Sequence, residues 1–190
     1  MAKFLKLLLR VFAPFAAGYF LSYLFRVVNA VIAPDLIQDI GASPSELGML
    51  TATYFLTFAA FQLPLGILLD RFGPRKVEAV LLVIAAIGAY IFARAETIIG
   101  LIWGRALIGL GVSACLMAAF KAYTMWFDRE RWPLINGFQM AAGGLGALAA
   151  TSPVEMILQY TDWRGLFLGL AVLCLLVCLL LLILVLEKKV

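Results

Sequence analysis

Six apolar stretches make up most of this sequence, and its charged residues gather in the short segments between them. An α-helix crosses the hydrocarbon core of a bilayer with about 20 apolar residues, so a chain of 190 residues has room for about six spans. Hydrophobic residues account for 65% of the chain and charged residues for 14%, whereas soluble domains contain about 45–50% and about 25%. The sequence therefore predicts an all-α integral membrane protein that forms a single domain over residues 1–190. The spans are expected at about 11–34, 45–69, 77–93, 98–127, 133–153 and 165–186.

The composition excludes several classes of function. The chain has no histidine, which excludes His-dependent catalytic triads and metal or haem sites built on histidine. Cys115, Cys174 and Cys178 lie inside apolar stretches, where helix packing or lipid contact explains them better than a disulfide or a metal site. Ser113 and Ser152 have no histidine or suitably spaced lysine to activate them. We therefore expect no enzyme activity, no metal and no cofactor.

The distribution of lysine and arginine predicts the orientation in the membrane. A net charge of +4 suggests nucleic-acid binding only where the cations form a basic face in water, and here they lie in short loops, so no nucleic-acid partner is expected. Loops rich in lysine and arginine stay on the cytoplasmic side. Arg94 and Arg164 are the two loop cations of one side. The other side carries ten, namely Lys3, Lys6, Arg10, Arg71, Arg75, Lys76, Arg129, Arg131, Lys188 and Lys189. Both termini are therefore expected in the cytoplasm, and the protein in the cytoplasmic (inner) membrane.

A charged turn between the second and third spans carries the most specific motif. It runs from Gly66 to Lys76 with the sequence GILLDRFGPRK. Gly66 allows helices to approach closely, whereas Gly73 and Pro74 favour a tight turn. The charged residues that can cluster at the membrane surface are Asp70, Arg71, Arg75 and Lys76. A glycine, an Asp-Arg pair four residues later, and then a glycine and a basic pair resemble the cytoplasmic signature of the major facilitator superfamily.

The fourth and fifth spans carry glycine motifs. Arg105 is followed by a Gly-x-Gly sequence, which resembles the fourth-helix motif of the same superfamily. Ile108 departs from that motif, because many members have a polar residue there. The fifth span departs from the Gly-Pro pattern of the antiporters, so antiport is not inferred. The glycines expected to serve helix packing are Gly109, Gly111, Gly143 and Gly144.

The resemblance covers nearly the whole chain but only the N-terminal half of a usual family member. Members have twelve helices in two six-helix bundles that hold the substrate between them, and each bundle is a 3+3 inverted repeat. The resemblance thus implies a half-sized secondary active transporter that works by alternating access, with the Asp70–Lys76 turn closing the inner face. Its second bundle is expected from a homodimer or from a missing C-terminal half. The alternative is a transport-inactive truncated membrane protein or scaffold.

Two arginines inside the spans indicate where a substrate binds. A cation in the hydrocarbon region costs at least about 2.5–3.5 kcal/mol, so it normally faces a cavity or a partner. From the rise of an α-helix, Arg26 lies roughly 12 Å and Arg105 roughly 10 Å below the outer ends of spans one and four, which line the cavity in this family. With no acid at that depth, the guanidinium groups favour a small organic or inorganic anion as substrate. The candidate cavity residues are Ser22, Arg26, Asn29, Tyr54 and Arg105.

Some charged positions have an alternative structural interpretation. Arg105 can instead bond backbone carbonyls or contact the second bundle. Lys121, about 24 Å further along the same helix, belongs to the inner mouth, where it either extends to the membrane surface or forms part of an inner gate. The acids considered for proton coupling lie near the outer ends of the spans, and they are Asp35 and Glu155.

Overall fold

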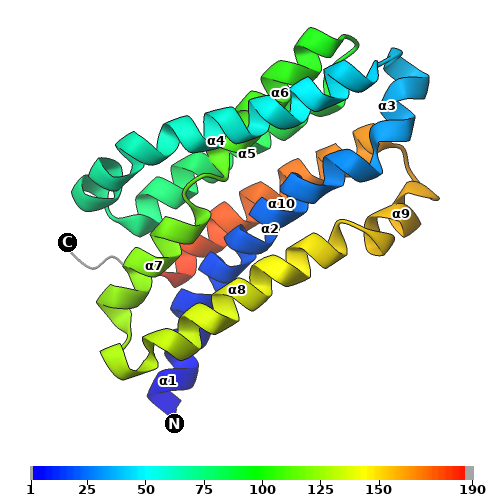
Figure 1. Cartoon of the computed structure of the whole chain (residues 1–190). Coiled ribbons are helices and arrows are strands. Elements are labelled where there is room, and N and C mark those ends of the chain that lie inside the picture. Colours follow the sequence, from blue (N-terminus) through cyan, green and yellow to red (C-terminus); the bar gives the residue numbers. More distant parts are fainter. Residues whose placement is uncertain (1, 187–190) are drawn as a thin grey trace.

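The computed structural model describes residues 2–186, and every regular element in that range is a helix. In chain order the elements are α1 (Ala2–Leu7), the π-helical segment η1 (Leu8–Phe12), α2 (Ala13–Val31), α3 (Ala33–Ile40), α4 (Pro44–Phe72), α5 (Pro74–Arg94), α6 (Ile98–Gly111), α7 (Cys115–Trp126), the 3-10 segment η2 (Arg129–Arg131), α8 (Trp132–Ala149), α9 (Ser152–Leu158) and α10 (Trp163–Leu184). Figure 1 shows the long helices running side by side, with α3 and α9 at one end. Six helices of the described residues are long and apolar enough to cross a membrane, which confirms the predicted fold class. They are Phe4–Val31, Pro44–Phe72, Pro74–Arg94, Ile98–Trp126, Arg129–Leu158 and Trp163–Leu184.

Several helices extend beyond the ranges expected from hydropathy. Arg10 and Asp70 are both helical, because a charged side chain at the bilayer edge can reach water without ending the helix. Local capping sets the ends instead. The Ser43 hydroxyl accepts from the Glu46 backbone N–H at 3.3 Å, and the Ser43 N–H donates to Glu46 Oε2 at 2.8 Å, which starts α4. Gly73, with φ of 79°, ends it in a conformation that favours glycine.

Four pairs of helices make the main contacts between spans: α5 with α10, α5 with α6, α2 with α8, and α4 with α6. If the first three spans are matched to the last three, the α2–α8 pair corresponds to the α4–α6 pair, and the α5–α10 pair corresponds to itself. In the α4–α6 pair Gly109 lies against the Tyr54 backbone carbonyl, and in the α2–α8 pair Gly146 lies against the Phe20 backbone carbonyl. These pairs match a 3+3 repeat, whereas the close α5–α6 contact has a much weaker counterpart between α10 and α2.

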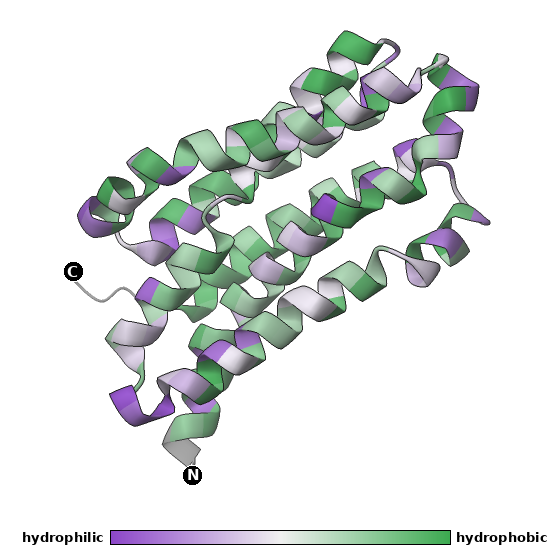
Figure 2. Ribbon diagram, in the orientation of Figure 1, coloured by the Kyte–Doolittle hydropathy of each residue, from purple (hydrophilic) through white to green (hydrophobic). Residues whose placement is uncertain are grey.

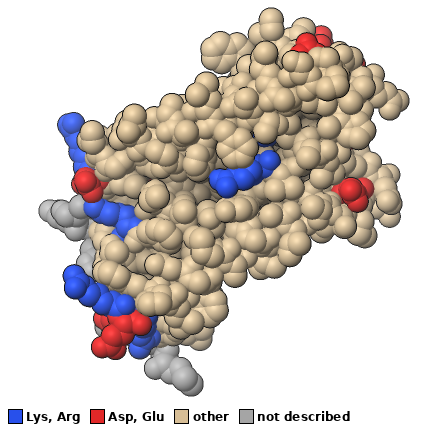
Figure 3. Space-filling model, viewed as in Figure 1, with Lys and Arg blue, Asp and Glu red and all other residues tan. Residues whose placement is uncertain are grey.

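Hydrophilic residues gather at the two ends of the bundle, whereas its length is mostly apolar (Figure 2). The start of α1, the α4–α5 turn, η2 and the end of α10 lie at one end (Figure 1). Basic side chains are concentrated at this end (Figure 3). The α3 and α9 helices at the other end carry Asp35, Asp39 and Glu155. Of the cations assigned to the inner side, Lys188, Lys189 and the side chain of Lys3 lie outside the described part of the structure.

The fourth span is interrupted between α6 and α7, at residues 112–114. The interruption frees backbone carbonyls from helical hydrogen bonding, and side chains of other helices bond to them. The Ser22 hydroxyl of α2 donates to the Val112 carbonyl at 3.5 Å, and Gln62 Nε2 of α4 donates to the Ser113 carbonyl at 3.0 Å. Polar side chains from two neighbouring spans therefore support the break in the middle of the bundle.

Candidate binding site in the middle of the bundle

Arg105 is fully enclosed at the centre of the bundle. Its side chain on α6 is 0% exposed, and its Nη1 donates a hydrogen bond to the Phe25 carbonyl of α2 at 2.9 Å. The guanidinium carbon lies 4.6 Å from the centroid of the Tyr54 ring of α4. Two further donors, Nε and Nη2, are buried without a hydrogen-bond partner among the described residues. Arg105 on α6 thus contacts both α2 and α4, and within the described chain two of its N–H-bearing nitrogens remain without a hydrogen-bond acceptor.

Arg26 lies on α2 in a partly exposed aromatic setting. Its guanidinium carbon is 4.5 Å from the ring centroid of Tyr23, 5.4 Å from that of Phe58 and 5.6 Å from that of Phe55. These distances are typical of cation–π contacts. Its Nε is buried without a partner, although the side chain as a whole is only half-buried. On the face shown in Figure 3, basic atoms reach the surface midway along the bundle as well as at its basic end.

Tyr54 brings the two arginines together. Its ring is buried on α4, and both guanidinium groups act on its hydroxyl electrostatically. That hydroxyl donates to the Ser22 carbonyl at 3.2 Å. The structure therefore assembles Ser22, Arg26, Tyr54 and Arg105 in one place, although the Ser22 hydroxyl itself bonds to the break in the fourth span.

Asn29 is buried on α2, like Ser22, but it bonds to Thr51 and not to the Arg26, Tyr54 and Arg105 cluster. Its Nδ2 donates to Thr51 Oγ1 of α4 at 3.1 Å, and its Oδ1 is buried without a partner. This contact lies between α2 and α4, in the direction of the end that carries α3. Asn29 therefore connects the two helices next to the cluster of Arg26, Tyr54 and Arg105.

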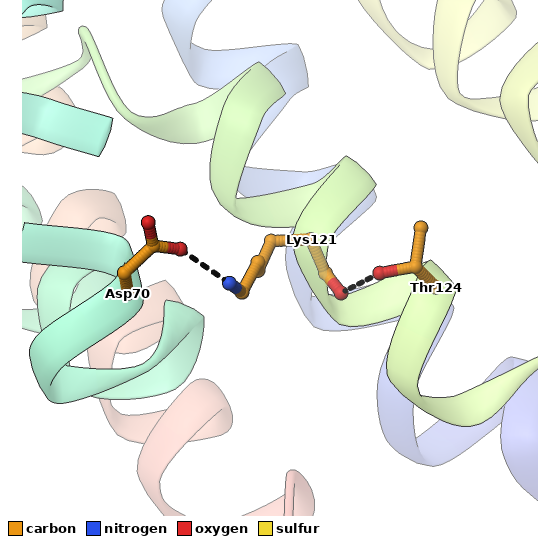
Figure 4. Close-up of polar contacts among 3 residues, drawn as sticks. All are labelled: Asp70, Lys121 and Thr124. Atoms are coloured by element: carbon orange, nitrogen blue, oxygen red, sulfur yellow. Dashed lines mark hydrogen bonds and ion pairs between the residues drawn. The ribbon is translucent and has the colours of Figure 1, made fainter. Parts of the chain in front are cut away.

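At the basic end, Asp70 of α4 forms an ion pair with Lys121 of α7, with Nζ 2.5 Å from Oδ1 (Figure 4). Thr124, one turn further along α7, donates its hydroxyl to the Lys121 carbonyl (Figure 4). A cavity of about 560 Å³ lies beside the pair, and Gln62, Gly66 and Phe120 are among its lining residues. Lys121 therefore pairs with the signature motif.

The other motif residues lie around the α4–α5 turn. Arg75 Nη2 donates to the Leu182 carbonyl of α10, which connects the turn to the last helix. Arg71 lies over the Phe72 ring, with its guanidinium carbon 5.3 Å from the ring centroid. Lys76 follows Arg75 in the first turn of α5.

The predicted packing glycines differ in what lies opposite them. A methyl group added at Gly109 would collide with the Tyr54 backbone, one at Gly111 with the Ala85 backbone, and one at Gly143 with the Tyr19 ring. Nothing in the described structure lies within 4 Å of such a group at Gly66 or Gly144. These two glycines therefore face open space on α4 and α8.

Two features of the structure were missed in the sequence. The aromatic rings around Arg26 come from two helices, and their i, i+3 spacing on α4 was the available signal. Glu78 lies one turn into α5 and is completely buried. Its signal was its position at helical spacing from Leu81, Leu82 and Ala85, which form the buried face of α5. Among the described residues, no group of three or more Cys, Asp and Glu side chains could hold a metal ion.

Six membrane-capable helices with Arg105 enclosed between them define a multi-pass α-helical membrane protein with a polar centre. Comparison of the sequence with known families identifies the group more closely. The Major Facilitator Superfamily matches residues 15–190, and the chain belongs to this superfamily. The resemblance drawn from the GILLDRFGPRK motif is thereby confirmed.

The curated relatives are transporters. The chain is 28% identical over 152 residues to a protein of Cupriavidus necator named "Probable sulfoacetate transporter SauU", covering 80% of this chain and 35% of that protein. It is 31% identical over 148 residues to "Uncharacterized transporter YybO" of Bacillus subtilis, covering 78% and 34%. It is 26% identical over 153 residues to "Putative multidrug resistance protein MdtD" of Escherichia coli O81, covering 80% and 32%. The chain thus spans about a third of the length of these relatives.

Proposed function

We propose that the chain is one half of a secondary active transporter that binds a small anion and works by alternating access. The observation that carries the proposal is the convergence of Arg26 and Arg105 on Tyr54 in the middle of the bundle. Asp70 forms an ion pair with Lys121 at the basic end, and among the described residues no ion pair involves Arg26 or Arg105. The two central guanidinium groups therefore have no carboxylate partner within the described chain.

The unused donors favour an anion. Arg105 has two buried N–H-bearing nitrogens without acceptors and Arg26 has one, and an unsatisfied buried donor costs free energy. Guanidinium groups match the paired oxygens of carboxylates, sulfonates and phosphates. Arg26 is the group that an anion reaches first, because Arg105 is fully enclosed. The relative named as a probable sulfoacetate transporter adds a candidate substrate that carries both a carboxylate and a sulfonate.

A second six-helix bundle completes the proposed binding cavity. The spans that contain α4 and α8 are the least buried of the six. Gly66 and Gly144 on these helices leave room for a closely approaching helix. The partner bundle is supplied by a second copy of the chain or by a C-terminal half. The exposed apolar residues that support such a contact are Leu56, Leu63, Ile67, Leu145 and Leu148.

The basic end is proposed to face the cytoplasm of a cell with this protein in its inner membrane, so both termini lie inside. Lysine and arginine gather there, as expected for cytoplasmic loops (Figure 3). The Asp70–Lys121 pair and the neighbouring cavity then lie at the inner mouth, where the signature turn closes against the second bundle.

Uptake of labelled sulfoacetate into proteoliposomes containing the protein tests this function. We expect Arg26→Gln to lower uptake at least about tenfold, the effect of losing one charge-assisted hydrogen bond. Arg26→Lys should retain part of the activity, because it keeps the charge but not the planar donor set. Arg94→Gln is the matched control, since Arg94 is an exposed arginine at the end of α5 and should leave uptake unchanged.

Competition experiments define the substrate class. Unlabelled carboxylates, sulfonates and inorganic phosphate should compete, whereas neutral sugars should not. Equal uptake by Arg26→Gln and the unaltered protein, for every anion that is transported, would overturn the assignment of Arg26. Absence of uptake and of binding for all these anions would overturn the proposed substrate class.

A further inference from the structure

A fully buried carboxyl group lies inside the bundle, separate from the two arginines. Glu78 is on α5, one turn after Pro74, and its side chain is 0% exposed. It faces Gly18 of α2, because a methyl group added to Gly18 would collide with Glu78 Oε1. The same methyl group would lie 3.7 Å from Cys115 Sγ of α7. The carboxyl group therefore occupies the space where α2, α5 and α7 meet.

Neither carboxyl oxygen has a hydrogen-bond partner among the described residues. The Cys115 thiol adjoins the group, and Cys174 of α10 acts electrostatically on that thiol. Tyr123 of α7 acts on the group electrostatically, but its hydroxyl donates to Gln139 Oε1 at 2.7 Å.

No cation compensates for the burial of Glu78 within the described chain. Burial is the dominant influence on the carboxyl group, and the adjacent thiol is the other. Arg75, on the same helix, donates to the Leu182 carbonyl of α10. An ionised carboxylate in this position would have neither water nor strong donors nor a counter-ion. Burying a neutral carboxylic acid there costs much less free energy than burying the carboxylate.

We propose that Glu78 is a proton-binding site that is occupied in this conformation. Release breaks the O–H bond, passes the proton to water and leaves the carboxylate behind. Water reaches the group only when α7 moves away from α2 and α5, so release and this movement accompany each other. Low pH therefore favours the closed packing around Glu78, and high pH favours the open one. The inference extends the proposed transport cycle by making its conformational equilibrium depend on pH.

Infrared spectroscopy of the purified chain tests the occupancy directly. A protonated carboxylic acid has a carbonyl stretch that a carboxylate and an amide lack. At neutral pH we expect this band in the unaltered protein and in Glu96→Gln, an exposed acid used as control, and its loss in Glu78→Gln. An unaltered protein without the band, or a Glu78→Gln spectrum that retains it in full, would overturn the proposal.

Cys115→Ser provides a second variant that leaves Glu78 in place. A hydroxyl is a stronger donor than a thiol. We expect the band to persist at a lower frequency, because a hydrogen bond to the carbonyl oxygen weakens the C=O bond. An unchanged frequency would show that the protonated carboxyl group does not adjoin Cys115, which contradicts the proposed site.

Labelling of Cys115 with a small maleimide tests the link to conformation. Cys174 and Cys178 are replaced by alanine, and the rate is measured from mildly acidic to alkaline pH with and without Glu78→Gln. Ionisation of the thiol raises the labelling rate in both proteins, so the informative quantity is the rate with Glu78 present divided by the rate in Glu78→Gln. We expect this ratio to rise several-fold with pH. A ratio that stays constant would overturn the link. Neither measurement uses transport, so failure of the anion-transport proposal leaves both results interpretable.

Discussion

The Arg105 guanidinium of α6 and the Tyr54 ring of α4 stack at the centre of the bundle, with the guanidinium carbon 4.6 Å from the ring centroid. Arg26 reaches the same tyrosine from α2 but remains partly open to the surface. Two arginines at similar depth therefore have different surroundings. One is bonded to a backbone carbonyl and enclosed, and the other is surrounded by aromatic rings and accessible.

This difference predicts unequal effects on stability. Arg105→Ala removes a charge-assisted hydrogen bond and leaves a cavity, so we expect the free energy of unfolding to fall by about 2–4 kcal/mol. Arg26→Ala should cost less than about 1 kcal/mol, because the side chain is half-exposed and makes cation–π contacts. Thermal unfolding of the two variants in detergent gives the comparison, and equal losses would contradict the structural difference.

The close glycine contacts predict which substitutions the bundle tolerates. Gly109→Ala and Gly146→Ala each place a methyl group against a backbone carbonyl, so we expect losses of about 1–3 kcal/mol in unfolding free energy. Gly144→Ala is the matched control on α8, where the added methyl group meets no atom of the described chain. It should be neutral or stabilise by up to about 1 kcal/mol, because alanine favours the helix over glycine. Chemical denaturation of the three variants distinguishes the two environments.

The Asp70–Lys121 pair predicts a modest coupling that a charge swap restores. The Asp70 side chain is 74% exposed, so the pair should contribute about 0.2–1 kcal/mol. Asp70→Lys or Lys121→Asp alone should slow transport through like-charge repulsion, and the double variant should recover part of the rate. Arg71→Gln, next to Asp70 but stacked on Phe72, serves as a control for loss of a cation. A double variant no faster than either single one would show that the pair has no role in transport.

The proposed orientation predicts opposite accessibility at the two ends. In a background with all three native cysteines replaced by alanine, Phe72→Cys places a thiol at the basic end and Tyr160→Cys one at the other end. In intact cells, we expect a membrane-impermeant maleimide to label the Tyr160→Cys variant alone. Labelling of Phe72→Cys should require permeabilised membranes, and the reverse pattern would reject the orientation.

The sequence was sufficient to predict the number of spans and the family, because both depend on local features. Apolar length defines a span, and the GILLDRFGPRK motif is a continuous string. The helical rise also placed Arg26 and Arg105 at a similar depth, and the resemblance to the superfamily placed their two spans around one cavity. Tyr54 was found by the same calculation, and the structure brings it to both arginines.

Lateral relationships between helices were beyond a single sequence. Gly109 and Gly144 are the same residue type in apolar helices, yet one lies against a backbone and the other faces open space. Glu78 could not be recognised as buried, because its burial depends on which face of α5 turns toward α2. The ion pair of Lys121 with Asp70 likewise depends on how α7 packs beside α4, which the sequence does not show.

The break at residues 112–114 gives the fourth span a hinge between two arms. The α6 arm is fixed to α4 through the Gly109–Tyr54 contact, whereas the α7 arm begins at Cys115, beside Glu78. The hydrogen bonds across this hinge come from the side chains of Ser22 and Gln62, whose rotamers can follow a change in angle. A bend there would let the inner mouth widen while the arginine cluster keeps its geometry.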